Sequence, residues 1–126
     1  MERLWVGWAA VFGFLGVALG AFGAHALRES LEPRDLEIFE TAVRYQLIHA
    51  VALLGVAAAA ARWPDVQTLL SASGWLLVAG VVVFSGSLYT LVGTGIRGFG
   101  AVTPIGGLAL LAGWAALAWA AFKTAG

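Results

Sequence analysis

Long uncharged stretches dominate the pattern of hydrophobic and polar positions along this chain. No Asp, Glu, Lys or Arg occurs in residues 4–26, 45–61, 66–96 or 98–122. A bilayer core about 30 Å thick needs roughly 20 apolar residues in a helix that rises 1.5 Å per residue. The pattern therefore predicts a polytopic membrane protein, in which every functional group must be placed relative to the bilayer.

Residues that break or begin helices set the bounds of the expected elements. Pro33 and Pro104 suit the first turn of a helix, with Thr103 as the N-cap of the last one. The segment Trp63-Pro64 and the glycines at 93 and 95 mark turns. We therefore expect one transmembrane domain over residues 1–126. It is an all-α, up-down bundle of four helices at residues 4–27, 33–61, 69–92 and 104–122.

The second of these helices is longer than a membrane requires. From residue 33 to residue 61 it measures about 43 Å, which exceeds the hydrocarbon thickness of about 30 Å. Leu36, Phe39 and Val43 share one face of its charged first turns. This pattern predicts an amphipathic start that lies at the membrane interface. Trp5 and Trp8 are expected in the aromatic belt of the opposite interface.

An even number of spans places both chain termini at one membrane face, here called face A together with the turn at residues 62–65. The other face, face B, holds the segment 28–44 and the link 93–102. Lys and Arg are divided almost evenly, with three on face A and four on face B. The positive-inside rule therefore leaves the orientation open.

Composition narrows the class of protein further. Hydrophobic residues make up 61% of the chain and charged residues 11%, whereas soluble domains carry roughly 25% charged residues. The formal net charge is zero, so no basic surface supports nucleic-acid binding. The chain has no cysteine, which excludes disulfides and thiolate chemistry.

Polar side chains concentrate in the half of the expected bundle nearest face B. Such groups are costly inside a membrane and indicate a functional site unless they are paired. Glu40 and Arg44 are four residues apart with the acid first, an order that favours a helical ion pair. The two are either a structural pair or part of a working site. The candidate cluster consists of His25, Glu40, Arg44, Tyr45, Gln46, His49, Ser85, Tyr89 and Thr103.

The two histidines are expected on neighbouring antiparallel helices, within reach of each other. Two imidazoles can ligate a metal ion or haem, or relay protons. Metal sites usually have three or four protein ligands, however, and Glu40 is the one further candidate beside His25 and His49. We therefore expect no cofactor and assign each histidine to a hydrogen bond with a backbone carbonyl or a hydroxyl. A His25–His49 metal or haem site and a proton relay are the alternatives.

Small residues form a stripe along the first helix. Gly13, Gly16, Gly20 and Gly23 recur at spacings of three and four. The pattern Gly16-x-x-x-Gly20 lets helix backbones approach closely in lipid, where packing replaces the hydrophobic effect. The stripe is either a packing seam within the bundle or the seam of a homo-oligomer.

The link before the last helix is rich in glycine and contains one cation. Free backbone N–H groups and a helix N-terminus favour anions, so Arg97, Gly98 and Gly100 are candidates for binding a phospholipid phosphate. The alternative is a tight turn with a snorkelling arginine.

Four ordered motifs carry a resemblance to a known family. They are GAFGAHAL at residues 20–27, ETAVRYQLIHA at 40–50, FSGSLY at 84–89, and TPIGG at 103–107 followed by GW at 113–114. In this order and spacing, over nearly its whole length, the chain resembles the family of small integral membrane proteins called domain of unknown function 423. The resemblance implies a four-helix protein of the bacterial inner membrane and supplies no reaction.

These features favour a non-enzymatic membrane protein, an accessory or structural component that binds lipid, a further copy of itself or a larger membrane partner. The first alternative is a homo-oligomeric transporter or channel for a small solute or proton. It requires His49, Glu40 and Arg44 to face a water-filled cavity. The second alternative is a membrane enzyme or cofactor carrier that binds a metal ion or haem through His25 and His49.

Overall fold

The structure is a computed structural model that describes residues 1–125 as four long helices joined by short connections. The helices are α1 (Glu2–Phe22), α2 (Pro33–Arg62), α3 (Gln67–Thr94) and α4 (Thr103–Ala125). Within the described residues there is no strand, and all four helices are long and apolar enough to cross a membrane. The expected all-α, four-helix membrane fold is confirmed.

Prolines and one glycine set the helix ends. Pro33 occupies the first turn of α2 with Asp35 beside it, where a missing N–H and a negative charge are both favourable. α3 ends at Gly95, whose φ of 75° is left-handed and whose N–H donates to the Leu91 carbonyl at 2.7 Å. α1 and α3 begin two residues before the expected bounds, and α4 ends three residues after them.

Two connections differ from the expected ones. Residues Gly23–Leu27, expected to complete the first α-helix, form a π-helical turn. The glycine-rich link forms a 3-10 helix at Arg97–Ala101. Thr103, expected as the N-cap of the last helix, is already its first residue. Its hydroxyl is bonded to the Ser87 hydroxyl of α3 at 2.6 Å.

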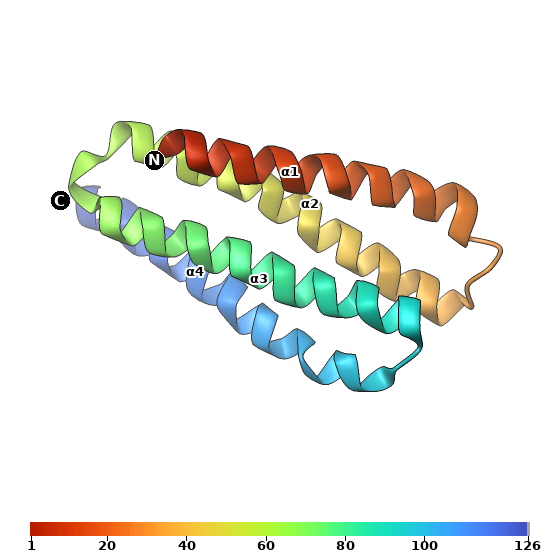
Figure 1. Cartoon of the computed structure of the whole chain (residues 1–126). Helices are drawn as coiled ribbons and strands as arrows, with labels where there is room; N and C mark the ends of the chain where they lie inside the picture. The colour runs from red at the N-terminus through yellow and green to blue at the C-terminus, as the bar shows by residue number, and fades with distance from the viewer. Residues whose placement is uncertain (126) are drawn as a thin grey trace.

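The bundle consists of two helical hairpins (Figure 1). α1 packs along α2, α3 packs along α4, and the hairpins meet along α2 and α3. α2 and α3 are therefore the inner helices, whereas α1 and α4 bury a smaller share of the residues in their membrane-spanning stretches. The two termini lie at the same end of the bundle (Figure 1), as four membrane crossings require.

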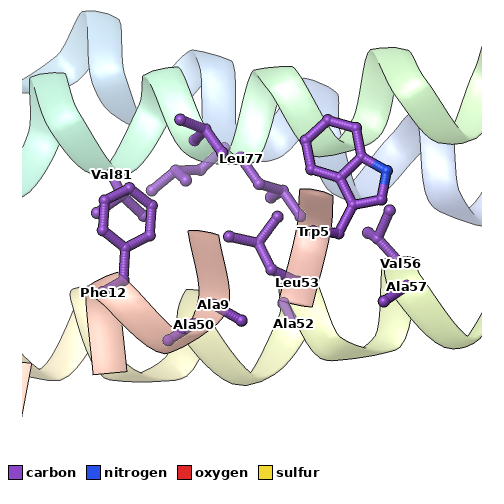
Figure 2. Close-up of a cluster of buried hydrophobic side chains, with 12 residues drawn as sticks. Trp5, Ala9, Phe12, Ala50, Ala52, Leu53, Val56, Ala57, Leu77 and Val81 are labelled. Atoms are coloured by element: carbon purple, nitrogen blue, oxygen red, sulfur yellow. The ribbon is translucent and has the colours of Figure 1, made fainter. Parts of the chain in front are cut away.

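The main apolar core is formed mostly by α1, α2 and α3, with Leu110 from α4, and contains Trp5, Leu53 and Leu77, all fully buried (Figure 2). The sequence predicted Trp5 in an aromatic belt at the interface. This prediction is wrong, because the Trp5 side chain is buried in the core. Its ring lies against Gly74, where a Cβ atom would come within 2.5 Å of the indole. The missing side chain at Gly74 makes the space that this tryptophan fills.

The apolar face at the start of α2 packs against α1. Phe39 and Val43 are buried, and they lie over Gly23 and Gly20. This face was expected to rest on the membrane surface. The glycines of α1 instead let the first turns of α2 pack against the bundle.

Candidate functional site

Gln46 joins three helices through hydrogen bonds near the middle of the bundle. Its side-chain Nε2 donates to the Phe12 carbonyl of α1 at 2.9 Å, and its Oε1 accepts from the Tyr89 hydroxyl of α3 at 2.7 Å. Gln46 itself is buried. A buried amide in lipid must find partners, because no water is present to satisfy it. The structure thus assigns Gln46 and Tyr89 to holding α1, α2 and α3 together.

His49 is buried and has a partner on each ring nitrogen. Its Nδ1 lies 2.7 Å from the Tyr45 carbonyl, and the indole Nε1 of Trp114 donates to its Nε2 at 3.0 Å. A carbonyl can only accept and an indole N–H can only donate. The imidazole is therefore neutral, with its proton on Nδ1. Neither nitrogen is free to ligate a metal ion.

His25 lies apart from His49, contrary to the expectation that the two imidazoles approach each other. His25 is exposed on the π-helical turn. The contacts of Gly20 with Val43 and of Gly16 with Leu47 place it level with residue 38 of α2. At 1.5 Å per residue, His49 lies about 16 Å farther along the bundle. Among the described residues, no group of three or more His, Cys, Asp and Glu is placed to hold a metal ion.

Glu40 and Arg44 are exposed, and the helical ion pair expected between them does not form. Both line a groove of about 310 Å³ between α1 and α2, above Gly20 and Gly23. His49 faces the opposite side of α2. A transport path through this bundle requires the three residues to line one cavity, and they do not.

Hydroxyl groups of α3 bind the neighbouring helices. Ser85 donates to the Ala42 carbonyl of α2 at 2.7 Å. Ser87 and Thr103 join α3 to α4. A further bond of 2.7 Å runs from Ser73 to the Gly113 carbonyl of α4, although Ser73 is not in the predicted cluster. These groups thus act as interhelical bonds.

Three of the four glycines in the stripe lie in the α1–α2 interface. A Cβ at Gly16 would lie 2.6 Å from Leu47, one at Gly20 would lie 3.3 Å from Val43, and one at Gly23 would clash with the ring of Phe39. Gly13 has nothing within 4 Å of such an atom. The stripe is thus placed as an internal seam, with Gly13 outside it.

Arg97 is already bound to a carboxylate. Its guanidinium donates to Asp35 at 2.9 Å and ties the link between α3 and α4 to the first turn of α2. The Arg97 side chain is 48% exposed, so this pair adds little stability. Gly98 and Gly100 belong to the 3-10 helix that carries Arg97. The contact with Asp35 uses one nitrogen of the guanidinium, and binding of a phosphate by Arg97 stays a prediction.

Two neighbouring hollows, which share Phe84 as a lining residue, lie along α2 from face B toward the middle of the bundle and are together called the α2–α4 groove. Its inner part has a volume of about 670 Å³, and its outer part a volume of about 430 Å³. Phe84 of α3 lines both parts. The α2 residues that line it are spaced three and four apart, so they form one face of that helix: Arg34, Glu37, Ile38, Thr41, Tyr45, Ile48 and His49.

The inner part of the groove is apolar and aromatic. Tyr45 stacks on Phe84 with ring centroids 4.4 Å apart, and Leu108 and Leu111 of α4 line the facing wall. The hydrogen bond between His49 and Trp114 forms part of its wall near the inner end. The inner part of the groove therefore presents an apolar concave surface to an apolar chain. The polar atoms of His49 and Trp114 in its wall are already hydrogen-bonded.

Trp114 is a site residue whose role the sequence did not predict. The sequence placed it in the motif GW at 113–114 but not in the candidate cluster, and it lies 11 residues after Thr103, about 16 Å from the start of α4. An indole N–H at that depth is below the interfacial belt and needs an acceptor inside the protein. The His49 imidazole can supply that acceptor. The depth of Trp114 in the membrane was therefore the signal that could have predicted its hydrogen bond with His49.

Replacing Trp114 by phenylalanine is expected to lower the free energy of unfolding by about 0.6–1.7 kcal/mol, which are the average and the largest values for interhelical hydrogen bonds in membranes. The substitution keeps an aromatic ring in the groove wall but removes the N–H that His49 accepts. Trp119→Phe, at a tryptophan of α4 that is 65% exposed, is the matched control and should change nothing. Unfolding by SDS in mixed micelles, followed by circular dichroism, measures both. Equal losses for the two variants would contradict the assignment.

Comparisons with known proteins agree with this architecture. Residues 19–107 match the family described as "Protein of unknown function (DUF423)". The chain is 42% identical over 114 residues to the UPF0382 membrane protein YwdK of Bacillus subtilis, which covers 90% of this chain and 92% of that protein.

Two relatives from other bacteria are equally similar. The UPF0382 inner membrane protein YgdD of Escherichia coli K12 is 41% identical over 114 residues, 90% of this chain and 86% of that protein. A UPF0382 membrane protein of Haemophilus influenzae is 41% identical over 124 residues, 98% of each chain. No solved structure gives a significant match. The chain therefore belongs to the DUF423 family of membrane proteins.

Proposed function

We propose that this protein is a non-enzymatic, accessory component of the bacterial inner membrane that binds a membrane lipid lengthwise in the α2–α4 groove. The observation that carries the proposal is the length of the groove. From Arg34 at its outer end to His49 at its inner end there are 15 residues of α2, about 22 Å. One leaflet, including its headgroups, is half of roughly 40–45 Å.

The chemistry of the groove supports binding rather than reaction. Its inner part is lined by aromatic and aliphatic side chains, which suit an acyl chain. The polar atoms of His49 and Trp114 bind each other, so this wall presents neither a free base nor a free acid to a ligand. Charged side chains line only the outer part, at the level expected for headgroups.

The test is to fill the inner part of the groove. Gly107 lines it, and a Cβ at this position would meet nothing closer than a Phe84 carbon at 4.0 Å. Gly107→Leu should therefore place its side chain in the groove without disturbing the core. Native mass spectrometry of the protein in mild detergent is expected to show a bound phospholipid on the wild type, and at least about tenfold less on Gly107→Leu.

Gly55→Leu is the matched control, because Gly55 lies exposed on α2 and a Cβ there would meet no atom within 4 Å. It should retain as much lipid as the wild type. Circular dichroism checks that both variants keep their helices. A wild type without lipid, or a Gly107→Leu variant that keeps it, would overturn the proposal.

A further inference from the structure

The outer part of the α2–α4 groove holds two opposite charges, Arg34 and Glu37. Both side chains are exposed, and within the described residues neither forms an ion pair with the other or with any third group. Three residues apart on a helix, their Cβ atoms are about 5–6 Å from each other. A cation and an anion held side by side, unpaired, are complementary to a ligand that carries both charges.

We infer that the groove selects a phospholipid with a phosphoethanolamine headgroup, an inference that rests on the proposed lipid-binding function. The phosphate would bind the guanidinium of Arg34, whose planar donors match phosphate oxygens. The primary ammonium, two carbons away, would donate to the carboxylate of Glu37. A choline headgroup lacks N–H donors for Glu37, and a glycerol headgroup lacks the positive charge.

The position of these charges fits one lipid molecule. Phe84 lines both parts, so a lipid with its headgroup at Arg34 and Glu37 would pass Phe84 and place its acyl chain beside Tyr45. The groove between α1 and α2 also carries an anion and a cation, Glu40 and Arg44. Its α2 wall extends only from Phe39 to Leu47, about 12 Å, and is too short for a whole leaflet.

The experiment offers the full-length protein an equimolar mixture of phosphatidylethanolamine, phosphatidylcholine and phosphatidylglycerol with identical acyl chains. Native mass spectrometry then counts the bound lipids. Phosphatidylethanolamine is expected to exceed each of the others by at least about fivefold. Glu37→Gln should remove its advantage over phosphatidylcholine, and Arg34→Gln should weaken all three. Glu40→Gln, in the other groove, is the matched control and should leave the ratios unchanged.

The outcomes separate the headgroup from the groove. Equal binding of the three lipids, or a preference for phosphatidylglycerol, overturns the headgroup inference, and the proposed function survives if Gly107→Leu still abolishes binding. If Gly107→Leu leaves the bound lipid in place, the groove itself is wrong. Since Arg34 and Glu37 are exposed, their variants are expected to fold, and circular dichroism verifies this.

Discussion

Replacing Gly106 by alanine is expected to destabilise the protein by about 2–3 kcal/mol, the upper part of the usual cost of overpacking. Gly106 lies in the close contact between α3 and α4. An added Cβ would lie 2.4 Å from the backbone nitrogen of Phe84 and 2.8 Å from its Cα. Backbone atoms cannot rotate away as a side chain can, so the two helices must separate. The free energy of unfolding is measured by SDS titration in mixed micelles.

The next residue along the chain provides the control. At Gly107, a Cβ would meet only a Phe84 ring carbon, at the ordinary contact distance of 4.0 Å. Gly107→Ala should therefore be nearly neutral, with the same small gain in helix propensity that Gly106→Ala receives. If the two alanine variants lose equal stability, the close packing of α3 on α4 is wrong.

The largest expected effect of removing a side chain is at Trp5, where Trp5→Ala should cost about 3 kcal/mol. Its indole is fully buried, packs on Gly74 and meets Trp75 edge to face at 5.2 Å. Because the outside of the bundle is lipid, the loss comes mainly from missing packing contacts rather than from transfer to water. The same SDS titration measures the free energy of unfolding.

Trp119→Ala is the matched control for this substitution, since Trp119 is largely exposed on α4. It removes the same side chain from a helix of similar length but creates no cavity, so its cost should stay below about 0.5 kcal/mol. A loss at Trp119 as large as that at Trp5 would show that the core in Figure 2 does not hold α1 in place.

The helices themselves could be predicted because their signals are local. Runs without charge give the spans, and Pro33 and Gly95 set ends where backbone geometry demands them. The π-helical turn at Gly23–Leu27 was not predictable in this way. Its first residue, Gly23, lies against Phe39 of α2, and a tertiary contact of this kind cannot be read from local sequence signals.

The candidate cluster was predictable as a set of residues but not as a set of bonds. Gln46 and Ser85 bind backbone carbonyls. Every residue has a backbone carbonyl, so the sequence does not show which one accepts the bond. Glu40 and Arg44 have the right spacing for an ion pair, yet in the structure they remain apart and exposed. Spacing along a helix shows which side chains can meet, and the packing of its neighbours decides which of them do.

The α2–α4 groove could not be predicted at all, because a groove is defined by atoms that are missing. Gly107 and Pro104 line it on α4, and in the sequence both read as ordinary helix-start and packing residues. Phe84 reads as one more core residue, and its position between the two parts of the groove follows from three helices at once. Only their relative placement reveals the space.

The two hairpins also imply an order of assembly during biosynthesis. The contacts of Gly16, Gly20 and Gly23 lie wholly within α1 and α2, so the first hairpin can close in the bilayer before the ribosome has released α3. α3 and α4 likewise carry their own close contacts, at Gly80 and Gly106. The bond between Gln46 and Tyr89 and the contact of Trp5 with Gly74 both cross between the hairpins, so neither can form before α3 is in place. The α2–α4 groove lies along the same boundary, between α2 of one hairpin and α4 of the other.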